Sequence, residues 1–290
     1  MKIILFSRYG IAHTAEQLQN LFRLLEQYGF DYEINVEFAN IVQELTNVVI
    51  PSDKIYPLNV KPQSTEAIML CFGGDGTLLE GIRRLEDNQI AVAGVNLGHL
   101  GFLTSVQHYE LEEFLKSIAE RTFHIQKRMT LEVEGVNDLT LTALNEVVVH
   151  RQEASMLRVK TKVNGQVVAR YNGDGVIIST PTGSTAYSLS AGGPIISPDC
   201  DTILLTPLAP HNFGVRPLVV PAWAEIELEI DPQYSLKAQL SVDNKTYSVE
   251  PTDQIKIRRS QRQILLVVSH NISFYETLRN KMMWDTDIRN

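Results

Sequence analysis

The first 120 residues alternate short apolar runs with segments of helical periodicity. Residues 2–6 predict a strand, and Thr14-Ala15-Glu16-Gln17 has the spacing of a capping box that starts a helix. Apolar residues then recur at helical spacing between Leu18 and Leu25, and Gly29 stands where such a helix would end. These signals predict a strand followed by an amphipathic helix.

A buried strand is predicted at Ile68–Phe72, because five apolar residues are followed by glycines. A helical pattern from Leu78 to Leu85 comes next, so Gly73–Thr77 is a turn from strand to helix. Further segments complete the pattern: strands at 32–38 and 90–95, a polar loop at 51–64, and a helix with apolar positions Leu111, Phe114, Leu115 and Ile118. This alternation predicts an α/β domain over residues 1–122, with a doubly wound, Rossmann-like parallel sheet.

Beyond residue 122 the pattern changes to short alternating runs, which predict a mostly β domain over residues 123–270. The expected strands lie at 139–149, 157–163, 166–171, 176–180, 216–220, 225–230, 236–242, 254–257 and 263–268. Asn164-Gly165 predicts a hairpin, and Pro207 is expected between strands or at a strand edge.

A final helix is predicted at Phe274–Met283, with Asn271 as its N-cap candidate. Residues 271–290 are expected to return to the first domain and complete it. The predicted fold is therefore α/β followed by all-β, closed by a helix.

The Gly73–Thr77 turn has the composition of a phosphate-binding loop. Glycines let a ligand approach the backbone, and a helix N-terminus offers unpaired N–H groups and a positive dipole end. An acid there repels phosphate, so Asp75 is better explained as a group that faces a hydroxyl or a metal ion. A tight turn rich in Gly and Asp is the structural alternative. Spacing alone leaves both interpretations open.

The charge of the chain argues against a nucleic acid or an anionic membrane as its partner. Its 290 residues carry a formal net charge of −8, with a pI near 5.4, and both of those partners are also negative. Cys71 and Cys200 form neither a disulfide framework nor a metal spacing, which favours a reducing cytoplasm. No apolar run approaches the length of a membrane span. We therefore expect a soluble cytoplasmic protein that acts on small molecules.

Three segments of the second domain carry candidate binding residues. Gly173-Asp174-Gly175 precedes a strand, and the hydroxyl-rich run Thr180–Tyr187 follows that strand, which suits an anion or ribose site with an aromatic face. Asn145-Glu146 interrupts an otherwise apolar strand. The alternatives are a turn that caps a helix through Ser184, and a bulge at a sheet edge. The chain has no Walker A loop and lacks the third glycine of the dinucleotide fingerprint.

Together these motifs resemble those of the NAD kinase family. Five segments occur in the order and approximate spacing of that family: Gly73–Thr77, the Asn-x-Gly-x-Leu-Gly-Phe run at Asn96–Phe102, Asn145-Glu146, Gly173–Gly175 and Thr180–Pro194. The first motif is shared with lipid kinases and, approximately, with phosphofructokinases, whereas the last is far more specific. The resemblance is strong over about residues 68–220.

The resemblance implies transfer of the γ-phosphoryl group of ATP to the 2′-hydroxyl of the adenosine ribose of NAD, which gives NADP. Such a transfer needs alignment and charge compensation, and a carboxylate can take the hydroxyl proton. Asp75 is therefore implied as the general base. Gly74, Gly76 and Thr77 would lie against the phosphates, and a divalent cation, Mg²⁺, would shield the acid from them.

The resemblance also implies a dinucleotide site in the second domain. Asn145 and Glu146 would hold the adenosine end of NAD, and Asp243 is a weaker candidate in the closing strands. The rest of the site would be lined by Asp174, Thr182, Thr185, Ala186, Tyr187, Ser188 and Ser190. Asn172 and Leu103 depart from the family pattern, which often has a basic residue and sometimes an aromatic residue at these positions. Relatives commonly form dimers or tetramers, so a homo-oligomer is implied.

Two other functions remain open at this point. A kinase with the same glycine and acid motif could act on a lipid or a sugar, although the Thr180–Tyr187 run and the acidic chain argue against it. A non-catalytic sensor could bind NAD and signal by changing shape, although Asp75 would then serve no purpose in a phosphate cradle.

Overall fold

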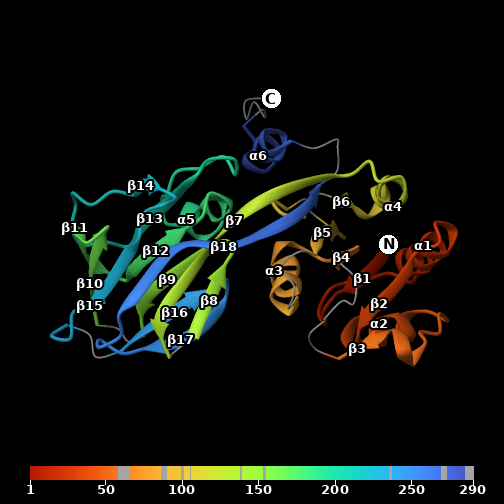
Figure 1. Cartoon of the computed structure of the whole chain (residues 1–290), viewed down its shortest axis with the longest axis horizontal. Coiled ribbons are helices and arrows are strands. Elements are labelled where there is room, and N and C mark those ends of the chain that lie inside the picture. The colour runs from red at the N-terminus through yellow and green to blue at the C-terminus, as the bar shows by residue number, and fades with distance from the viewer. Residues whose placement is uncertain are drawn as a thin grey trace. The chain divides into compact units, whose positions relative to one another are not determined.

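The computed structural model describes residues 1–57, 66–85, 90–98, 101–104, 106–137, 139–152, 155–234, 237–268 and 273–284 (Figure 1). The chain divides into two compact units. Unit 1 contains Met1–Lys127 and Ile264–Asn290, and unit 2 contains Arg128–Gln263. Two strands, β7 (His124–Val136) and β18 (Ile255–Val268), each begin in one unit and end in the other.

Unit 1 is built on a parallel sheet, as the sequence predicted. Its strands run in the order β18–β5–β4–β1–β2–β3, and β6 pairs with β5. Their bounds are β1 Lys2–Phe6, β2 Asp31–Asn35, β3 Ile55–Tyr56, β4 Ala67–Phe72, β5 Ala91–Asn96 and β6 Val106–Gln107. All of β4 is buried, which explains its continuous apolar sequence.

Four helices cover the two faces of this sheet: α1 Ala15–Gln27, α2 Val36–Leu45, α3 Asp75–Arg84 and α4 Leu111–Ala119. Unit 1 also contains the helix α6 Phe274–Met282 and the short 3-10 turns η1 Ser52–Lys54 and η2 His108–Glu110. Alternate residues of β4 point to opposite faces. Ile68, Leu70 and Phe72 pack in one core with α1, α2 and α4, whereas Gly81 of α3 lies against Met69 and Cys71.

The ends of α1 and α6 can be compared with the helix caps that the sequence predicted. Thr14 caps α1 through a complete capping box with Gln17, and Gly29 beyond its end has φ +66°, both as predicted. The N-cap of α6 is Ser273, whose hydroxyl accepts from the Glu276 N–H. Asn271, the predicted cap, lies outside the described residues.

Two predictions for residues 32–64 were wrong in part. The strand expected at 32–38 ends at Asn35, where α2 begins, because Phe38, Ala39, Ile41 and Val42 form a buried helical stripe. The loop expected at 51–64 includes η1 and β3, and residues 58–64 lie outside the described part of the chain.

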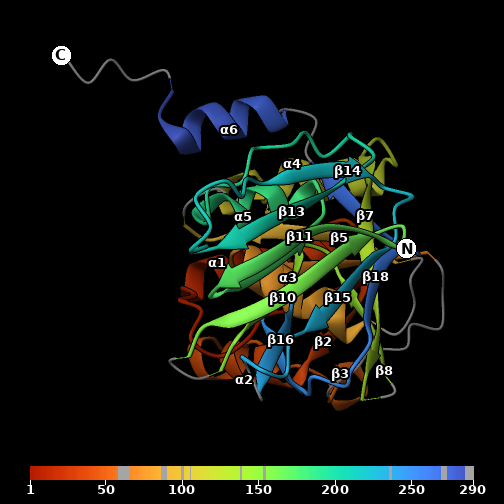
Figure 2. The same cartoon turned by 90° about the vertical axis from the view of Figure 1, so that its left-hand side faces the viewer.

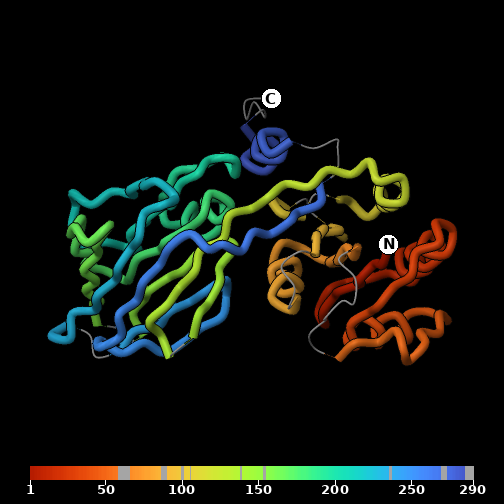
Figure 3. Tube along the Cα trace, in the orientation of Figure 1, coloured from red at the N-terminus to blue at the C-terminus, as the bar shows by residue number. Residues whose placement is uncertain are grey.

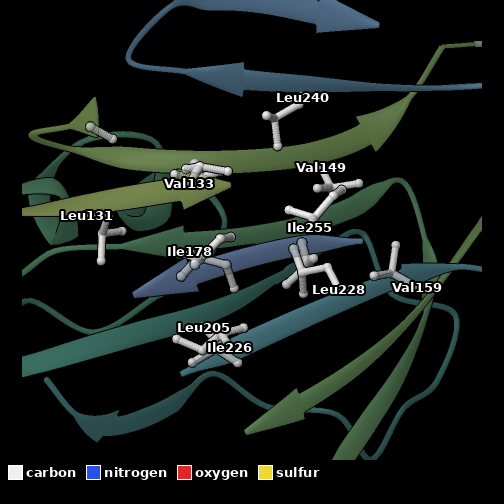
Figure 4. Close-up of a cluster of buried hydrophobic side chains, with 14 of the residues drawn as sticks. Leu131, Val133, Val149, Val159, Ile178, Leu205, Ile226, Leu228, Leu240 and Ile255 are labelled. Atoms are coloured by element: carbon white, nitrogen blue, oxygen red, sulfur yellow. The ribbon is translucent and has the colours of Figure 1, made fainter. Parts of the chain in front are cut away.

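Unit 2 is mostly β, as predicted, and its strands pair in antiparallel fashion. One sheet has the order β14–β13–β12–β9–β16–β17, and the other contains β11–β10–β15–β18 together with β7 and β8. Figure 2 shows β11, β10, β15 and β18 side by side in the second sheet. The bounds are β8 Leu139–Ala143, β9 Glu146–Arg151, β10 Leu157–Val163, β11 Gln166–Gly173, β12 Gly175–Ser179, β13 Thr202–Leu208, β14 Leu218–Pro221, β15 Ile226–Ile230, β16 Ala238–Val242 and β17 Lys245–Val249. Alternate residues such as Val149, Ile178, Leu205 and Leu240 from one sheet, and Val159, Leu228 and Ile255 from the other, form the core of unit 2 (Figure 4).

Several strand predictions in unit 2 needed correction. The run at 139–149 is two strands, β8 and β9, which belong to different sheets. The strands expected at 254–257 and 263–268 are one 14-residue strand, β18, visible as an uninterrupted blue segment in Figure 3. Pro207 lies inside β13, not between strands. At this position β13 pairs on one side only, with β12, because β14 pairs with residues 202–205, and a proline is tolerated where one side of a strand is unpaired.

Asn164-Gly165 forms the predicted hairpin between β10 and β11. Among the residues that the structure describes, no helix combines the length and the apolar character needed to cross a bilayer.

Candidate active site

The glycine turn lies between β4 and α3, at the carboxyl edge of the parallel sheet. Gly74 is the N-cap of α3, so Asp75 is the first helical residue and the helix begins earlier than the apolar pattern indicated. Gly73 has φ +147°, and an added Cβ would lie 2.5 Å from Thr77 Oγ1. This position therefore requires glycine on both conformational and steric grounds.

The Asp75 side chain is held by the loop that follows β5. Its Oδ1 accepts hydrogen bonds from Leu103 N–H (3.1 Å), Thr104 N–H (3.0 Å) and the Thr104 hydroxyl (3.0 Å). Its Oδ2 accepts one from Phe102 N–H (2.9 Å). The turn after β4 and the loop after β5 are therefore neighbours, as expected for segments that leave adjacent parallel strands at the same edge.

Close packing surrounds this carboxylate. An added Cβ at Gly101 would overlap both Asp75 Oδ1 and Thr104 Oγ1, so the loop can approach Asp75 only with glycine at this position. Thr77 is buried, and its hydroxyl has no hydrogen-bond partner within the described residues. Gly76 has open space except for Arg8, whose guanidinium would lie 3.6 Å from an added Cβ. Arg8 was not anticipated, because nothing in its local sequence distinguishes it.

In unit 2, Asn145 and Glu146 lie where the chain passes from β8 in one sheet to β9 in the other. The Asp243 carboxylate accepts hydrogen bonds from the backbone N–H groups of Leu144 (2.5 Å), Asn145 (2.9 Å) and Glu146 (3.2 Å). Asp243 and Asn244 form the two-residue turn between β16 and β17, with φ of +42° and +70°. A hairpin turn thus fixes the Asn145-Glu146 backbone.

Glu146 is an unusual acid because it is buried beside another carboxylate. Burial and the charge of Asp243 raise its pKa from 4.5 to about 8, against a smaller lowering effect of a hydrogen bond from the Tyr187 backbone. Its Oε2 atom has no partner among the side chains and backbone that the structure describes. At neutral pH this side chain is mostly protonated, so it can donate a hydrogen bond as well as accept one.

The hydroxyl-rich run forms two short turns, η3 Thr182–Thr185 and α5 Tyr187–Ser190. Ser184 does not cap a helix: its hydroxyl donates to Pro181 O (2.7 Å) and accepts from Ile196 N–H (2.9 Å). Ser188 is fully buried, and its hydroxyl is paired with that of Thr206 (2.7 Å). Thr182 is buried, Thr185 and Ala186 are half-buried, and Tyr187 and Ser190 are exposed.

A cavity of about 360 Å³ in unit 2 brings together Glu146, Asp174 and Tyr187. The other lining residues are Val148, His150, Arg151, Leu208, Ser241 and Asn244, none of which the sequence indicated. Asp174 is paired with Arg151, whose Nε lies 2.9 Å from Asp174 Oδ1. The predicted residues Asn145, Thr182, Thr185, Ala186 and Ser190 do not line this cavity.

Unit 1 has a larger cavity, of about 720 Å³, beside α1 and α4, but none of the predicted site residues lines it. Across the described residues, no three His, Cys, Asp or Glu side chains come close enough together to hold a metal ion.

Comparisons with known proteins bear on both units. The ATP-NAD kinase N-terminal domain family matches residues 13–123, and the ATP-NAD kinase C-terminal domain family matches residues 144–269. The chain is 35% identical to an NAD kinase of Flavobacterium psychrophilum and to one of Bacteroides fragilis, with all of both chains covered in each case.

The fold is also similar to those of solved structures. A yeast NADH kinase complexed with NADH has a TM-score of 0.86 at 23% identity, covering 100% of this chain and 89% of the other. An NAD kinase from Archaeoglobus fulgidus in complex with ATP has a TM-score of 0.73 at 24% identity, covering 98% of each chain.

Proposed function

The chain belongs to the NAD kinase family and is a phosphotransferase, and we propose that it transfers the γ-phosphoryl group of ATP to the 2′-hydroxyl of the adenosine ribose of NAD. The new bond joins the ribose oxygen to phosphorus, the bond from the γ-phosphorus to the bridging oxygen breaks, and ADP leaves. The observation that supports this reaction most directly is the fixed Asp75 carboxylate at the start of α3.

Asp75 would act as the general base that takes the proton of the 2′-hydroxyl. Oδ1 already accepts three hydrogen bonds, whereas Oδ2 accepts only one, from Phe102 N–H. A carboxylate oxygen has room for about two hydrogen bonds in its plane. Oδ2 is therefore the better-placed atom to accept the hydroxyl proton as the phosphoryl group is transferred.

Gly74, Gly76 and Thr77 would lie against the ATP phosphates at the N-terminus of α3, where backbone N–H groups favour anions. Arg8, beside Gly76, adds a positive charge at the same place. Mg²⁺ is usually held by one or two carboxylates together with substrate phosphates. We propose that it enters bound to ATP, with Asp75 as the acid of the turn that would hold those phosphates.

The residues of unit 2 would hold the dinucleotide. Glu146, with a pKa raised to about 8, can donate a hydrogen bond to a ribose or adenine acceptor. Tyr187 offers an exposed aromatic face, and Asp174 is oriented by Arg151. The remaining proposed contacts come from Asn145, Thr182, Thr185, Ala186 and Ser190, and buried Ser188 would support their turn through Thr206.

The test is NADP formation by the purified protein with NAD, ATP and Mg²⁺, detected through an NADP-specific dehydrogenase. Asp75→Asn should lower kcat by about 10²- to 10⁴-fold, the usual contribution of a general base, while NAD still binds in calorimetry. Asp53→Asn, which makes the same change at an exposed position of unit 1, should keep the parent rate. If the parent binds NAD but makes no NADP, the sensor function replaces the kinase; phosphorylation of a sugar or lipid instead would indicate the related kinase class.

We also propose that the protein is a cytoplasmic homo-oligomer, either a dimer or a tetramer. Exposed apolar side chains on β11 and β14, including Val167, Val168, Leu218 and Val219, would suit contact with a second copy. Sedimentation equilibrium measures the oligomeric state, and a monomer at micromolar concentration would contradict the proposal.

A further inference from the structure

Thr104 donates more hydrogen bonds to the Asp75 carboxylate than any other described residue. It donates two of the four hydrogen bonds that the carboxylate accepts, one from its N–H and one from its hydroxyl, both 3.0 Å long and both to Oδ1. Thr104 is fully buried. A buried hydroxyl with such a partner has a fixed direction, so its proton can be traced.

The direction of that proton follows from Asn96, the last residue of β5. Asn96 Oδ1 accepts from Gly98 N–H (2.7 Å), so its other side-chain atom, Nδ2, is the one that faces Thr104. An amide nitrogen only donates, and Asn96 Nδ2 lies 3.2 Å from Thr104 Oγ1. The Thr104 hydroxyl therefore accepts from Asn96 and gives its own proton to Asp75.

Glycines at two positions make this arrangement possible. An added Cβ at Gly94 of β5 would lie 2.8 Å from the Thr104 Cα, so the loop can cross the strand only where no side chain projects. Gly101 leaves room for the Asp75 carboxylate itself. The directed series of hydrogen bonds thus runs from the Gly98 backbone through Asn96 and Thr104 to Oδ1 of Asp75.

We propose that Thr104 is a positioning residue for the reaction. Its hydroxyl, oriented by Asn96, holds Oδ1 and thereby fixes the rotation of the carboxylate, so that Oδ2 faces the reacting hydroxyl. This inference rests on the proposed function of Asp75 as the general base. Charge-assisted hydrogen bonds of this kind are stronger than neutral ones, and positioning errors of about 1 Å reduce rates by about 10²-fold.

Two variants of Thr104 test the proposal. Thr104→Val keeps the shape and removes the hydroxyl, and it should lower kcat by about 10- to 100-fold, which corresponds to losing one hydrogen bond to a charged group. The KM values for NAD and ATP should stay within about twofold, because the change affects the transition state rather than binding. Thr104→Ser restores the hydroxyl and should recover kcat to within about threefold of the parent.

Thr161→Val is the matched control. Thr161 is also fully buried, and its hydroxyl has no partner among the described residues, so this variant should keep the parent kcat. Thermal unfolding of every variant would identify a loss of folded protein.

Combining variants separates this inference from the proposed function. In an Asp75→Asn background, Thr104→Val should cause no further loss, because Thr104 acts through Asp75. If Asp75→Asn keeps the parent kcat, the general-base assignment fails. If Asp75→Asn loses activity but Thr104→Val keeps kcat, changes only KM, or lowers the rate equally in both backgrounds, Thr104 is not a positioning residue. If Thr104→Ser does not rescue the rate, the hydroxyl is not the group that matters.

Discussion

The raised pKa of Glu146 in unit 2 predicts how the free energy of unfolding depends on pH. Glu146 has its pKa raised from 4.5 to about 8, first by burial and then by the charge of Asp243. A carboxyl group with a higher pKa in the folded protein binds more protons when folded, so the free energy of unfolding falls as pH rises from about 4.5 to about 8. Glu146→Gln cannot ionise and should not show this loss.

The size of the effect follows from the pKa displacement. At about 1.4 kcal/mol per pKa unit, the displacement corresponds to about 5 kcal/mol when the side chain is fully ionised. The effects of water and relaxation are already contained in the pKa of the folded protein, so the full value applies at pH 9, where the side chain is mostly ionised. At about 2–4 °C per kcal/mol, the melting temperature of Glu146→Gln should lie above that of the parent by about 10–20 °C at pH 9.

The assay is thermal unfolding followed by circular dichroism at pH 5 and pH 9. At pH 5 both side chains are neutral, and the two proteins should melt at similar temperatures. Glu250→Gln removes an exposed carboxyl group of the same unit and should show no such dependence on pH. The reasoning is refuted if Glu146→Gln differs from the parent equally at both pH values, or if its advantage appears at pH 5.

Two other changes are expected to lower stability. Asp243→Ala removes the acceptor of three backbone N–H groups. It should lower the free energy of unfolding by about 3 kcal/mol or more, at about 1–3 kcal/mol for each buried group left unpaired, and it should weaken NAD binding in calorimetry. Unchanged melting and binding would contradict the role of Asp243 in fixing Asn145-Glu146. Thr14→Ala removes the N-cap of α1 and should lower the free energy of unfolding in urea by about 1 kcal/mol, whereas Thr14→Ser should be close to the parent. Equal stability of all three proteins would mean that the cap contributes nothing.

Features that depend on neighbouring residues in the sequence were predictable. The capping box of α1, the buried strand β4 and the Asn164-Gly165 hairpin each follow from local spacing, and the structure has them where expected. The glycine turn was recognised in the same way, because Gly73 needs a backbone conformation that few other residues adopt.

Features that depend on distant partners were not predictable. The 139–149 run reads as one strand, and only its pairing partners show that Asn145 marks a change of sheet. Residues 32–38 alternate as a strand would, but residues 36–45 also have apolar positions at helical spacing. Residues 36–45 form the helix α2, because its apolar stripe packs in the core of unit 1. The hydrogen bonds from Thr104 to Asp75 join residues 29 positions apart, and no local pattern reports them.

The course of β18 has a consequence for synthesis of the protein on the ribosome. Its first part belongs to unit 2, whereas Leu266 pairs with Val92 and Val267 lies in the core of unit 1. Unit 1 therefore cannot complete its sheet when residue 127 is translated. It must wait for about 140 more residues, roughly 10–30 s at common elongation rates, while the part of the β5 edge that β6 does not cover is open to wrong pairing. Stalled nascent chains that end before β18 can be compared with chains that continue beyond residue 268 into a linker long enough to bring β18 out of the ribosomal tunnel. In limited proteolysis, protection of unit 1 should appear only in the longer chains.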